Sequence, residues 1–200
     1  MKNKIYKICV CGVGGQGIIK TSLILGEATL NNNENVVMSE IHGMSQRGGV
    51  VSTELKIGDA KSPIIEEGEA DIIIAFEPVE ALRTLEKTNK DTVIILNTHP
   101  IIPATISNDE KAYPKLEVII QELENKVAKV YPIDAYNIAL EAGHLLSINM
   151  ALLGATSAIK DFPVNKELII ESMKNNLSEK TIPINMASFN NGYESCKKLQ

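Results

Sequence analysis

The sequence has little cysteine and no excess of positive charge. Its only cysteines are Cys9, Cys11 and Cys196, whereas an iron–sulfur cluster takes about four thiolates in local groups. We therefore expect that this chain alone holds no four-cysteine cluster. The formal net charge of −5 excludes a general electrostatic attraction to nucleic acid or to anionic membranes, so neither is expected as a partner.

Long apolar runs are also missing. Residues 72–76 and 93–96 are apolar, but they are far shorter than the roughly 20 residues that a membrane-spanning helix needs. No N-terminal stretch combines a basic flank, a long apolar region and a small-residue cleavage site. These absences predict a cytoplasmic protein.

Motifs of known catalytic sites are absent as well. The sequence contains no Gly-x-Ser-x-Gly elbow, no His-Glu-x-x-His and no complete phosphate loop. No metal-ligand spacing links His42, His99 and His144, so we expect no catalytic residue and no bound metal. Glu77 and Glu80 lie at a predicted helix start, where capping is their expected role.

Strand-like and helical segments alternate along the chain. Apolar runs predict strands at residues 5–11, 35–39, 50–57, 71–76, 92–97 and 129–132. Helical patterns follow Gln16, Pro78, Lys115 and Ala135, and a wholly helical region begins near Ser147. The prediction is a single α/β domain over residues 1–200, of the three-layer Rossmann-like kind, with a mostly parallel sheet, helices on both faces and a helical C-terminal region.

Three segments have distinct local features. Residues 50–57 alternate apolar with polar side chains, which is typical of a half-exposed or an antiparallel strand. Residues 100–114 contain three prolines and are predicted to form a surface loop. Cys9 and Cys11 are two residues apart on a predicted strand, so they share one face, either as small buried hydrophobes or as redox or ligand groups.

The first glycine motif, residues 12–17, connects a predicted strand to a helix start. Gly12, Gly14 and Gly17 have the dinucleotide-binding spacing, and Glu40 lies near the end of the next strand, where a ribose-binding acid is expected. Backbone N–H groups and the helix dipole at such a position favour an anionic ligand. A tight strand-to-helix crossover that binds nothing is the alternative.

The second motif is the polar, glycine-flanked segment 39–49, which a nicotinamide-binding domain does not require. Arg47 lies beside Gln46 and before two glycines, so its guanidinium could grip a phosphate, a carboxylate or a partner's backbone. Pairing with Glu40 as a solvated loop arginine is equally consistent with the sequence. Met44 would supply a flexible apolar contact, and His42 could titrate near neutral pH.

Together the two motifs resemble the gamma-type domain of 2-oxoacid:ferredoxin oxidoreductases. The sequence of residues 42–49 is most similar to that of the indolepyruvate-type members. Later segments fit the same family in order and spacing: residues 77–83, Asn97 with Thr98 and Pro103, residues 149–154 and residues 190–193. Two positions depart from the family pattern. Lys56 stands where arginine is expected, and residues 31–35 form an asparagine-rich turn where glycine is commoner.

The resemblance implies a role for the chain in a larger enzyme. Family members oxidatively decarboxylate a 2-oxoacid to an acyl-coenzyme A and pass the electrons to ferredoxin. It implies that this chain is the smaller, non-redox subunit, while thiamine diphosphate and the iron–sulfur clusters belong to a large partner subunit. Coenzyme A would approach residues of the two motifs, which are Gly12, Gly14, Gly15, Gln16, Gly17, Ser45, Gln46 and Arg47.

Two other functions remain open from the sequence. The first is a free-standing NAD(P)-dependent oxidoreductase, although the nucleotide-binding-like domain takes up almost the whole chain and leaves little to position a substrate. The second is a structural adaptor subunit without ligand contact.

Overall fold

The computed structural model of the protein describes residues 4–43, 49–102 and 113–200. These residues form a six-stranded sheet of order β2-β3-β1-β4-β5-β6. The strands are β1 (Tyr6–Val13), β2 (Val36–His42), β3 (Val50–Ile57), β4 (Ile72–Ala75), β5 (Val93–Asn97) and β6 (Lys129–Ile133). Each strand lies where the apolar pattern predicts it, to within a few residues.

The sheet is mostly parallel, as predicted. β1, β4, β5 and β6 pair in parallel. β3 runs antiparallel to both of its neighbours, β1 and β2, which confirms the antiparallel interpretation of residues 50–57. Because β1, β4 and β5 point the same way, their carboxyl ends meet at one edge of the sheet, where α/β proteins bind their ligands.

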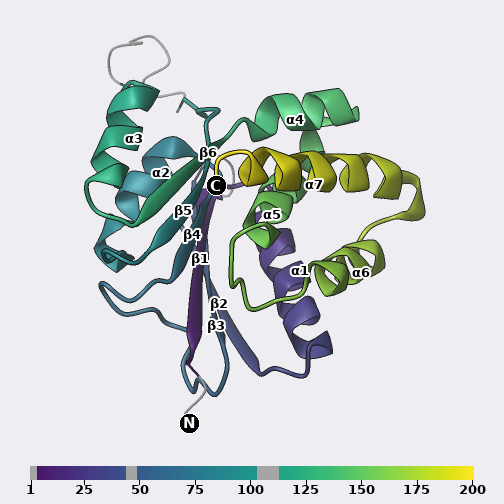
Figure 1. Cartoon of the computed structure of the whole chain (residues 1–200), viewed down its shortest axis with the longest axis horizontal. Coiled ribbons are helices and arrows are strands. Elements are labelled where there is room, and N and C mark those ends of the chain that lie inside the picture. The colour runs from purple at the N-terminus through teal and green to yellow at the C-terminus, as the bar shows by residue number, and fades with distance from the viewer. Residues whose placement is uncertain (1–3, 44–48, 103–112) are drawn as a thin grey trace.

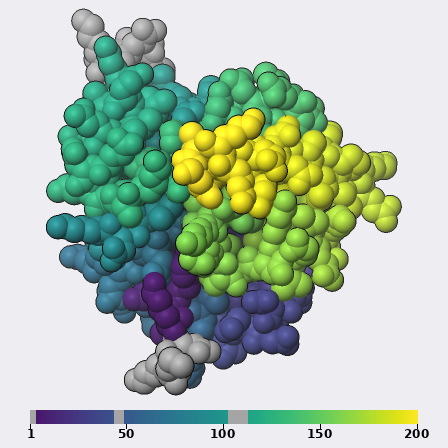
Figure 2. Space-filling view, in the orientation of Figure 1, coloured from purple at the N-terminus to yellow at the C-terminus, as the bar shows by residue number. Residues whose placement is uncertain are grey.

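Helices cover both faces of the sheet (Figure 1). One face carries α2 (Pro78–Arg83) and α3 (Leu116–Glu124). The other carries the longer helices α1 (Ile18–Asn31), α5 (Ile148–Ser157), α6 (Lys166–Asn176) and α7 (Ile182–Lys197), with α4 (Ala135–Ala142) beside α7. Short 3-10 turns lie at Leu85–Lys87, Leu145–Ser147 and Glu179–Thr181. Figure 2 shows α7 (yellow) lying across the molecular surface.

Alternation along β1 divides the core in two. Ile8 and Val10 pack toward α1 and α5, whereas Cys9 and Cys11 pack toward α2 and α3. The two cysteines therefore share a face, as predicted, and both are buried. Burial raises the pKa of the Cys9 thiol to about 12 and raises that of Cys11 as well, which favours their role as small buried hydrophobes.

The half-exposed interpretation of β3 is wrong. Glu54 and Lys56 are 1% and 6% exposed, because the connection between β3 and β4 (residues 58–71) folds over them. Lys56 Nζ lies 2.9 Å from a carboxylate oxygen of Glu66 in this connection. The lysine at this departure from the family pattern therefore contacts a carboxylate of its own chain.

The remaining local predictions concern turns and loops. Asn33, in the asparagine-rich turn, has a φ of 58°, a left-handed conformation that asparagine tolerates. Of the predicted loop at 100–114, residues 103–112 lie outside the described part of the chain, and those described on either side form neither helix nor strand. No helix within the described ranges is long and apolar enough to cross a membrane.

Candidate functional site

The first glycine motif forms the turn between β1 and α1 at the carboxyl edge of the sheet. Gly15 and Gly17 adopt left-handed φ values of 100° and 86°, and Gly17 is the N-cap residue of α1. No side chain among the described residues caps this helix start. Its first backbone N–H groups, at the positive end of the helix dipole, can therefore meet an anionic ligand.

Close packing beneath the turn requires glycine at two positions. A Cβ atom at Gly17 would lie 2.8 Å from Nδ2 of Asn149, at the start of α5. A Cβ atom at Gly12 would lie 2.7 Å from Cβ of Phe76. Because glycine has no Cβ atom, the turn packs closely on Asn149 and Phe76, and a ligand could approach its backbone directly.

The side chain of Gln16 is turned toward the protein. Its Oε1 accepts the N–H of Val13 at 2.8 Å, and its Nε2 donates to the carbonyl of Phe76 at 2.9 Å. Gln16 thus joins the ends of β1 and β4, and both polar atoms of its side chain are bonded within the protein. That its amide contacts coenzyme A stays a prediction.

The two glycine motifs meet in space. The N–H of Gly14 donates to the carbonyl of Gly49 at 2.9 Å, and the N–H of Gly43 donates to the carbonyl of Val50 at 2.7 Å. Ser45, Gln46 and Arg47 lie outside the described residues, so their ligand roles stay predictions. Glu40 Oε2 lies 3.2 Å from Nε2 of His42, so this carboxylate has a partner on its own strand.

Two pockets open on either side of the turn. The first, of about 280 Å³, is bounded by the glycine turn, the segment after β5 and the start of α5: Gly15, Gln16, Gly17, Ile101, Leu145, Leu146 and Ile148. The second, of about 370 Å³, lies between the turn, the end of β2 and the start of β3: Val13, Gly14, Gly15, Gly17, Ile18, Ile19, His42 and Val51. The glycine backbone is the polar wall that the two pockets share.

The first pocket has an apolar rim on the surface. Leu146 is 75% exposed, and Ile101 and Leu145 are also exposed. We name Ile101, Leu145 and Leu146 the apolar rim. Aliphatic side chains gathered beside a ligand-sized pocket are typical of a protein contact surface.

The end of β4 connects the parts of this site, a role that the sequence did not reveal. The carbonyl of Phe76 accepts from Gln16 and, at 3.0 Å, from Nδ2 of Asn97 at the end of β5. The next residue, Glu77, accepts the N–H of Glu80 at 3.0 Å, which confirms its predicted capping of α2. Glu80 instead pairs with Arg83, and burial raises the pKa of the Glu80 carboxyl.

The other histidines have structural contacts. The ring of His99 stacks on Tyr136 at 3.9 Å between centroids, and Nδ1 of His144 accepts the N–H of Leu146 at 3.1 Å. Among the described residues, no group of three histidine, cysteine or acidic side chains could hold a metal ion. The arrangement can bind a ligand that has both an anionic and an apolar part. Its backbone N–H groups suit the anion, and its aliphatic walls suit the apolar part.

The chain is similar to known proteins over nearly its whole length. The family model described as pyruvate ferredoxin/flavodoxin oxidoreductase matches residues 7–195. The chain is 50% identical over 188 residues to indolepyruvate oxidoreductase subunit IorB of Methanothermobacter thermautotrophicus, covering 94% of this chain and 96% of that one. It is 37% identical over 198 residues to the subunit of the same name from Thermococcus kodakarensis, covering 98% of each chain.

Solved structures share the fold. The gamma subunit of a keto/oxoacid ferredoxin oxidoreductase from Geobacter sulfurreducens superposes with a TM-score of 0.72 at 21% identity, covering 96% of this chain and 99% of that one. A 2-oxoglutarate:ferredoxin oxidoreductase from Magnetococcus marinus, solved with 2-oxoglutarate, coenzyme A and succinyl-CoA bound, gives 0.77 at 21% identity, covering 99% of this chain and 32% of that longer one.

The family resemblance predicted from the two glycine motifs is confirmed, and so is the α/β fold. Because the family model spans nearly the whole chain and one relative is identical at half of the aligned positions, the chain belongs to the pyruvate ferredoxin/flavodoxin oxidoreductase family, as a counterpart of its IorB subunits.

Proposed function

We propose that the chain is the smaller subunit of an indolepyruvate-type 2-oxoacid:ferredoxin oxidoreductase. The complex would oxidatively decarboxylate aryl 2-oxoacids to acyl-coenzyme A, with ferredoxin as electron acceptor. The names and near full-length match of the IorB relatives support this proposal. We further infer that residues 1–200 form one gamma-type domain, since the family match spans residues 7–195, and that the protein is cytoplasmic.

We infer that coenzyme A binds at the glycine turn. The observation that carries this inference is the start of α1, which no described side chain caps and which opens onto both pockets. Phosphate oxygens would meet N–H groups of Gly15, Gly17 and Ile18, and the aliphatic walls would take the less polar arm of the molecule. Gly12 and Gly14 would keep the turn close to the sheet, with Ser45, Gln46 and Arg47 as further donors.

Thiamine diphosphate and iron–sulfur clusters belong, in this proposal, to a large partner subunit. The cysteines of this chain do not fit a cluster, because Cys9 and Cys11 are buried on one side of the sheet and Cys196 is buried on the other. Ferredoxin would therefore exchange electrons with the complex through the partner. The apolar rim is the surface that we assign to this partner.

Reconstitution tests the proposal. The chain is assayed alone and after co-expression with the large subunit encoded nearest to it, by coenzyme A-dependent reduction of a viologen dye with different 2-oxoacids. We expect activity only in the co-expressed sample, and the highest activity with indolepyruvate. Activity of the chain alone, or NADH binding seen as a fluorescence change, would instead favour a free-standing dehydrogenase.

Arg47→Ala separates the ligand role from the docking role. If Arg47 grips coenzyme A, the variant complex should need roughly tenfold more coenzyme A for half-maximal rate, because a charge-assisted contact is lost. Gln16→Glu is not a suitable control, since it also changes the internal bonds of the turn. Arg83→Ala is a suitable control, because Arg83 pairs with Glu80 away from the turn. An unchanged coenzyme A requirement with weaker subunit association would contradict the ligand role.

A further inference from the structure

Glu77 has a buried carboxylate that joins three separate segments of the chain. The residue is 2% exposed and follows β4 directly. Its Oε1 accepts the N–H of Ile101 at 3.2 Å and also the hydroxyl of Tyr113, while Oε2 accepts the N–H of Glu80. Capping of α2 needs only the last of these bonds, so the first two call for another explanation.

The contacts of Glu77 are hydrogen bonds rather than an ion pair. The nearby Arg83 pairs with Glu80, and within the described residues no cationic group pairs with Glu77. Burial, followed by the hydrogen bond to Glu77, raises the pKa of the Tyr113 phenol, so this hydroxyl remains a donor at neutral pH. The carboxylate is therefore a fixed acceptor for both Ile101 and Tyr113.

Two of the three walls of the first pocket lead back to the end of β4. One wall is the glycine turn, which the carbonyl of Phe76 holds through the side chain of Gln16. The other includes Ile101, whose backbone Glu77 holds. Two consecutive residues thus determine how far apart these two walls lie.

We propose that Glu77 is a positioning residue for the coenzyme A site, which fixes Ile101 as a wall of the first pocket beside the glycine turn. This inference rests on the proposed function, because it takes the first pocket as part of that site. Without the bonds of Glu77 to Ile101 and Tyr113, the segment after β5 would lose this anchor, while the remaining bond to Glu80 would keep α2 capped. The pocket would then bind coenzyme A less tightly, with little change in the turnover of bound substrate.

Glu77→Asp separates positioning from capping. Aspartate is a preferred N-cap residue, so α2 should keep its cap, but the side chain is one methylene too short to hold Ile101 and Tyr113 as well. In the isolated full chain, hydrogen exchange at the Ile101 amide should become roughly tenfold faster, with the urea midpoint little changed. In the reconstituted complex, KM for coenzyme A should rise about fivefold and kcat change less than twofold.

Two further variants keep the test decisive. Tyr113→Phe removes one donor without shortening Glu77 and should shift exchange and KM in the same direction by a smaller factor. Glu80→Gln, on the same helix but bonded to Arg83, should leave the Ile101 amide and KM for coenzyme A unchanged.

Each outcome bears on a separate claim. Unchanged exchange at Ile101 in Glu77→Asp would overturn the anchoring of this segment. Faster exchange with an unchanged KM for coenzyme A would overturn the positioning role. Failure of the proposed function itself would appear in the wild-type complex, as a lack of coenzyme A-dependent activity.

Discussion

The two faces of the sheet are covered by different kinds of contact. On the face with the longer helices, α5 and α7 cross with their backbones touching. A Cβ atom at Gly154 would lie 2.0 Å from the carbonyl oxygen of Phe189, and one at Gly192 would lie 2.0 Å from that of Ala151. The helices on this face are held together by close backbone packing and by the burial of apolar side chains.

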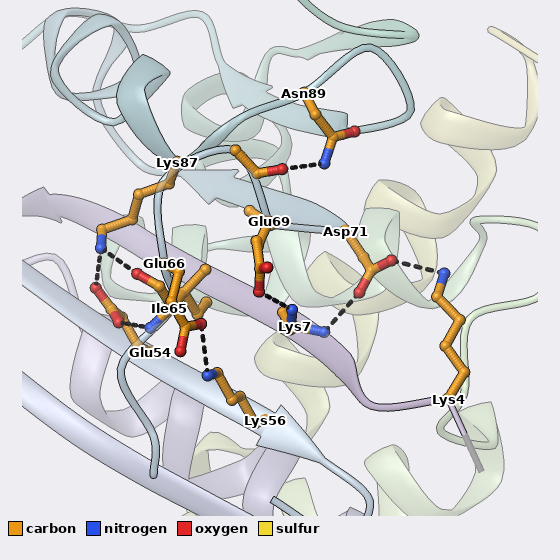
Figure 3. Close-up of polar contacts among 12 residues, drawn as sticks. Lys4, Lys7, Glu54, Lys56, Ile65, Glu66, Glu69, Asp71, Lys87 and Asn89 are labelled. Atoms are coloured by element: carbon orange, nitrogen blue, oxygen red, sulfur yellow. Dashed lines mark hydrogen bonds and ion pairs between the residues drawn. The ribbon is translucent and has the colours of Figure 1, made fainter. Parts of the chain in front are cut away.

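The other face depends partly on buried charge. Beyond α2 and α3, the β3–β4 connection covers β3, and Figure 3 shows the ion pairs that fasten it. Glu54 lies 2.8 Å from Nζ of Lys87 and accepts the N–H of Ile65, while Lys56 pairs with Glu66. In the sheet register Lys56 stands opposite Lys7, and Lys7 pairs with Glu69 of the same connection. The carboxylates of the connection thus offset two neighbouring like charges.

This difference predicts opposite sensitivities. The helix-rich face should tolerate no added volume at Gly154 or Gly192, because the backbone atoms that they face cannot move aside as a flexible side chain can. The charged face should tolerate changes of surface volume but not the loss of one partner from a buried pair.

Gly192→Ala should be the most destabilising change. The added methyl would overlap the backbone of α5, so α7 would have to move away, at an expected cost of more than about 3 kcal/mol in the free energy of unfolding. Urea denaturation followed by circular dichroism measures this. Gly26→Ala is the matched control, since Gly26 lies in α1 with nothing within 4 Å of its added Cβ, and should stabilise by up to about 1 kcal/mol. Equal effects of the two substitutions would contradict the close crossing.

Glu54→Gln should cost less, about 2 kcal/mol, because Lys87 keeps a bond to the carbonyl of Ile65 and its side chain is partly exposed. The loss should be local. Cys9 lies opposite Glu54 in the sheet, so native-state labelling of Cys9 and Cys11 by a thiol reagent should speed up relative to Cys196.

Glu86→Gln is the control for this change, since Glu86 is exposed beside Lys87 and its substitution should stay within about 0.5 kcal/mol. Uniformly faster labelling of all three cysteines in Glu54→Gln would mean that the two faces unfold together, and the contrast between them would fail.

Local patterns were sufficient to predict most of the fold. The β1–α1 unit and the positions of the strands depend on neighbouring residues, so periodicity and residue type predict them. For residues 50–57 the alternation left a half-exposed and an antiparallel strand open, and only the antiparallel interpretation is right. The burial of Glu54 and Lys56 could not be predicted this way. Their partners come from the β3–β4 connection and from Lys87, which the sheet brings close only in the folded chain.

The candidate site shows the same division. The capping by Glu77 acts over three residues and was predicted, whereas its bonds to Ile101 and Tyr113 span 24 and 36 residues and were not. Gln16 was assigned to a ligand, yet its side chain bonds across 60 residues to Phe76. A glutamate followed by proline at a strand end was the one signal in the sequence that pointed to this position.

The smallest predicted effect concerns pH and the Lys56–Glu66 pair. The hydrogen bond from Lys56 lowers the pKa of the Glu66 carboxyl to about 2, below the value of about 4.3 expected in the unfolded chain. A carboxyl whose pKa is lower in the folded state than in the unfolded chain stabilises the protein fully at pH values above the unfolded-state pKa. This stabilisation is lost as the pH falls through the folded-state pKa.

The urea midpoint of the wild type should therefore decline between about pH 5 and pH 2, and part of this decline should disappear in Glu66→Gln. Because the Glu66 side chain is 61% exposed, the difference should be small and should shrink further in high salt. Glu67→Gln, at the exposed neighbouring residue, should follow the wild-type curve. If the wild type and Glu66→Gln instead declined in parallel, the Lys56–Glu66 pair would add nothing to stability, and the charged face would depend on the pairs of Glu54 and Glu69.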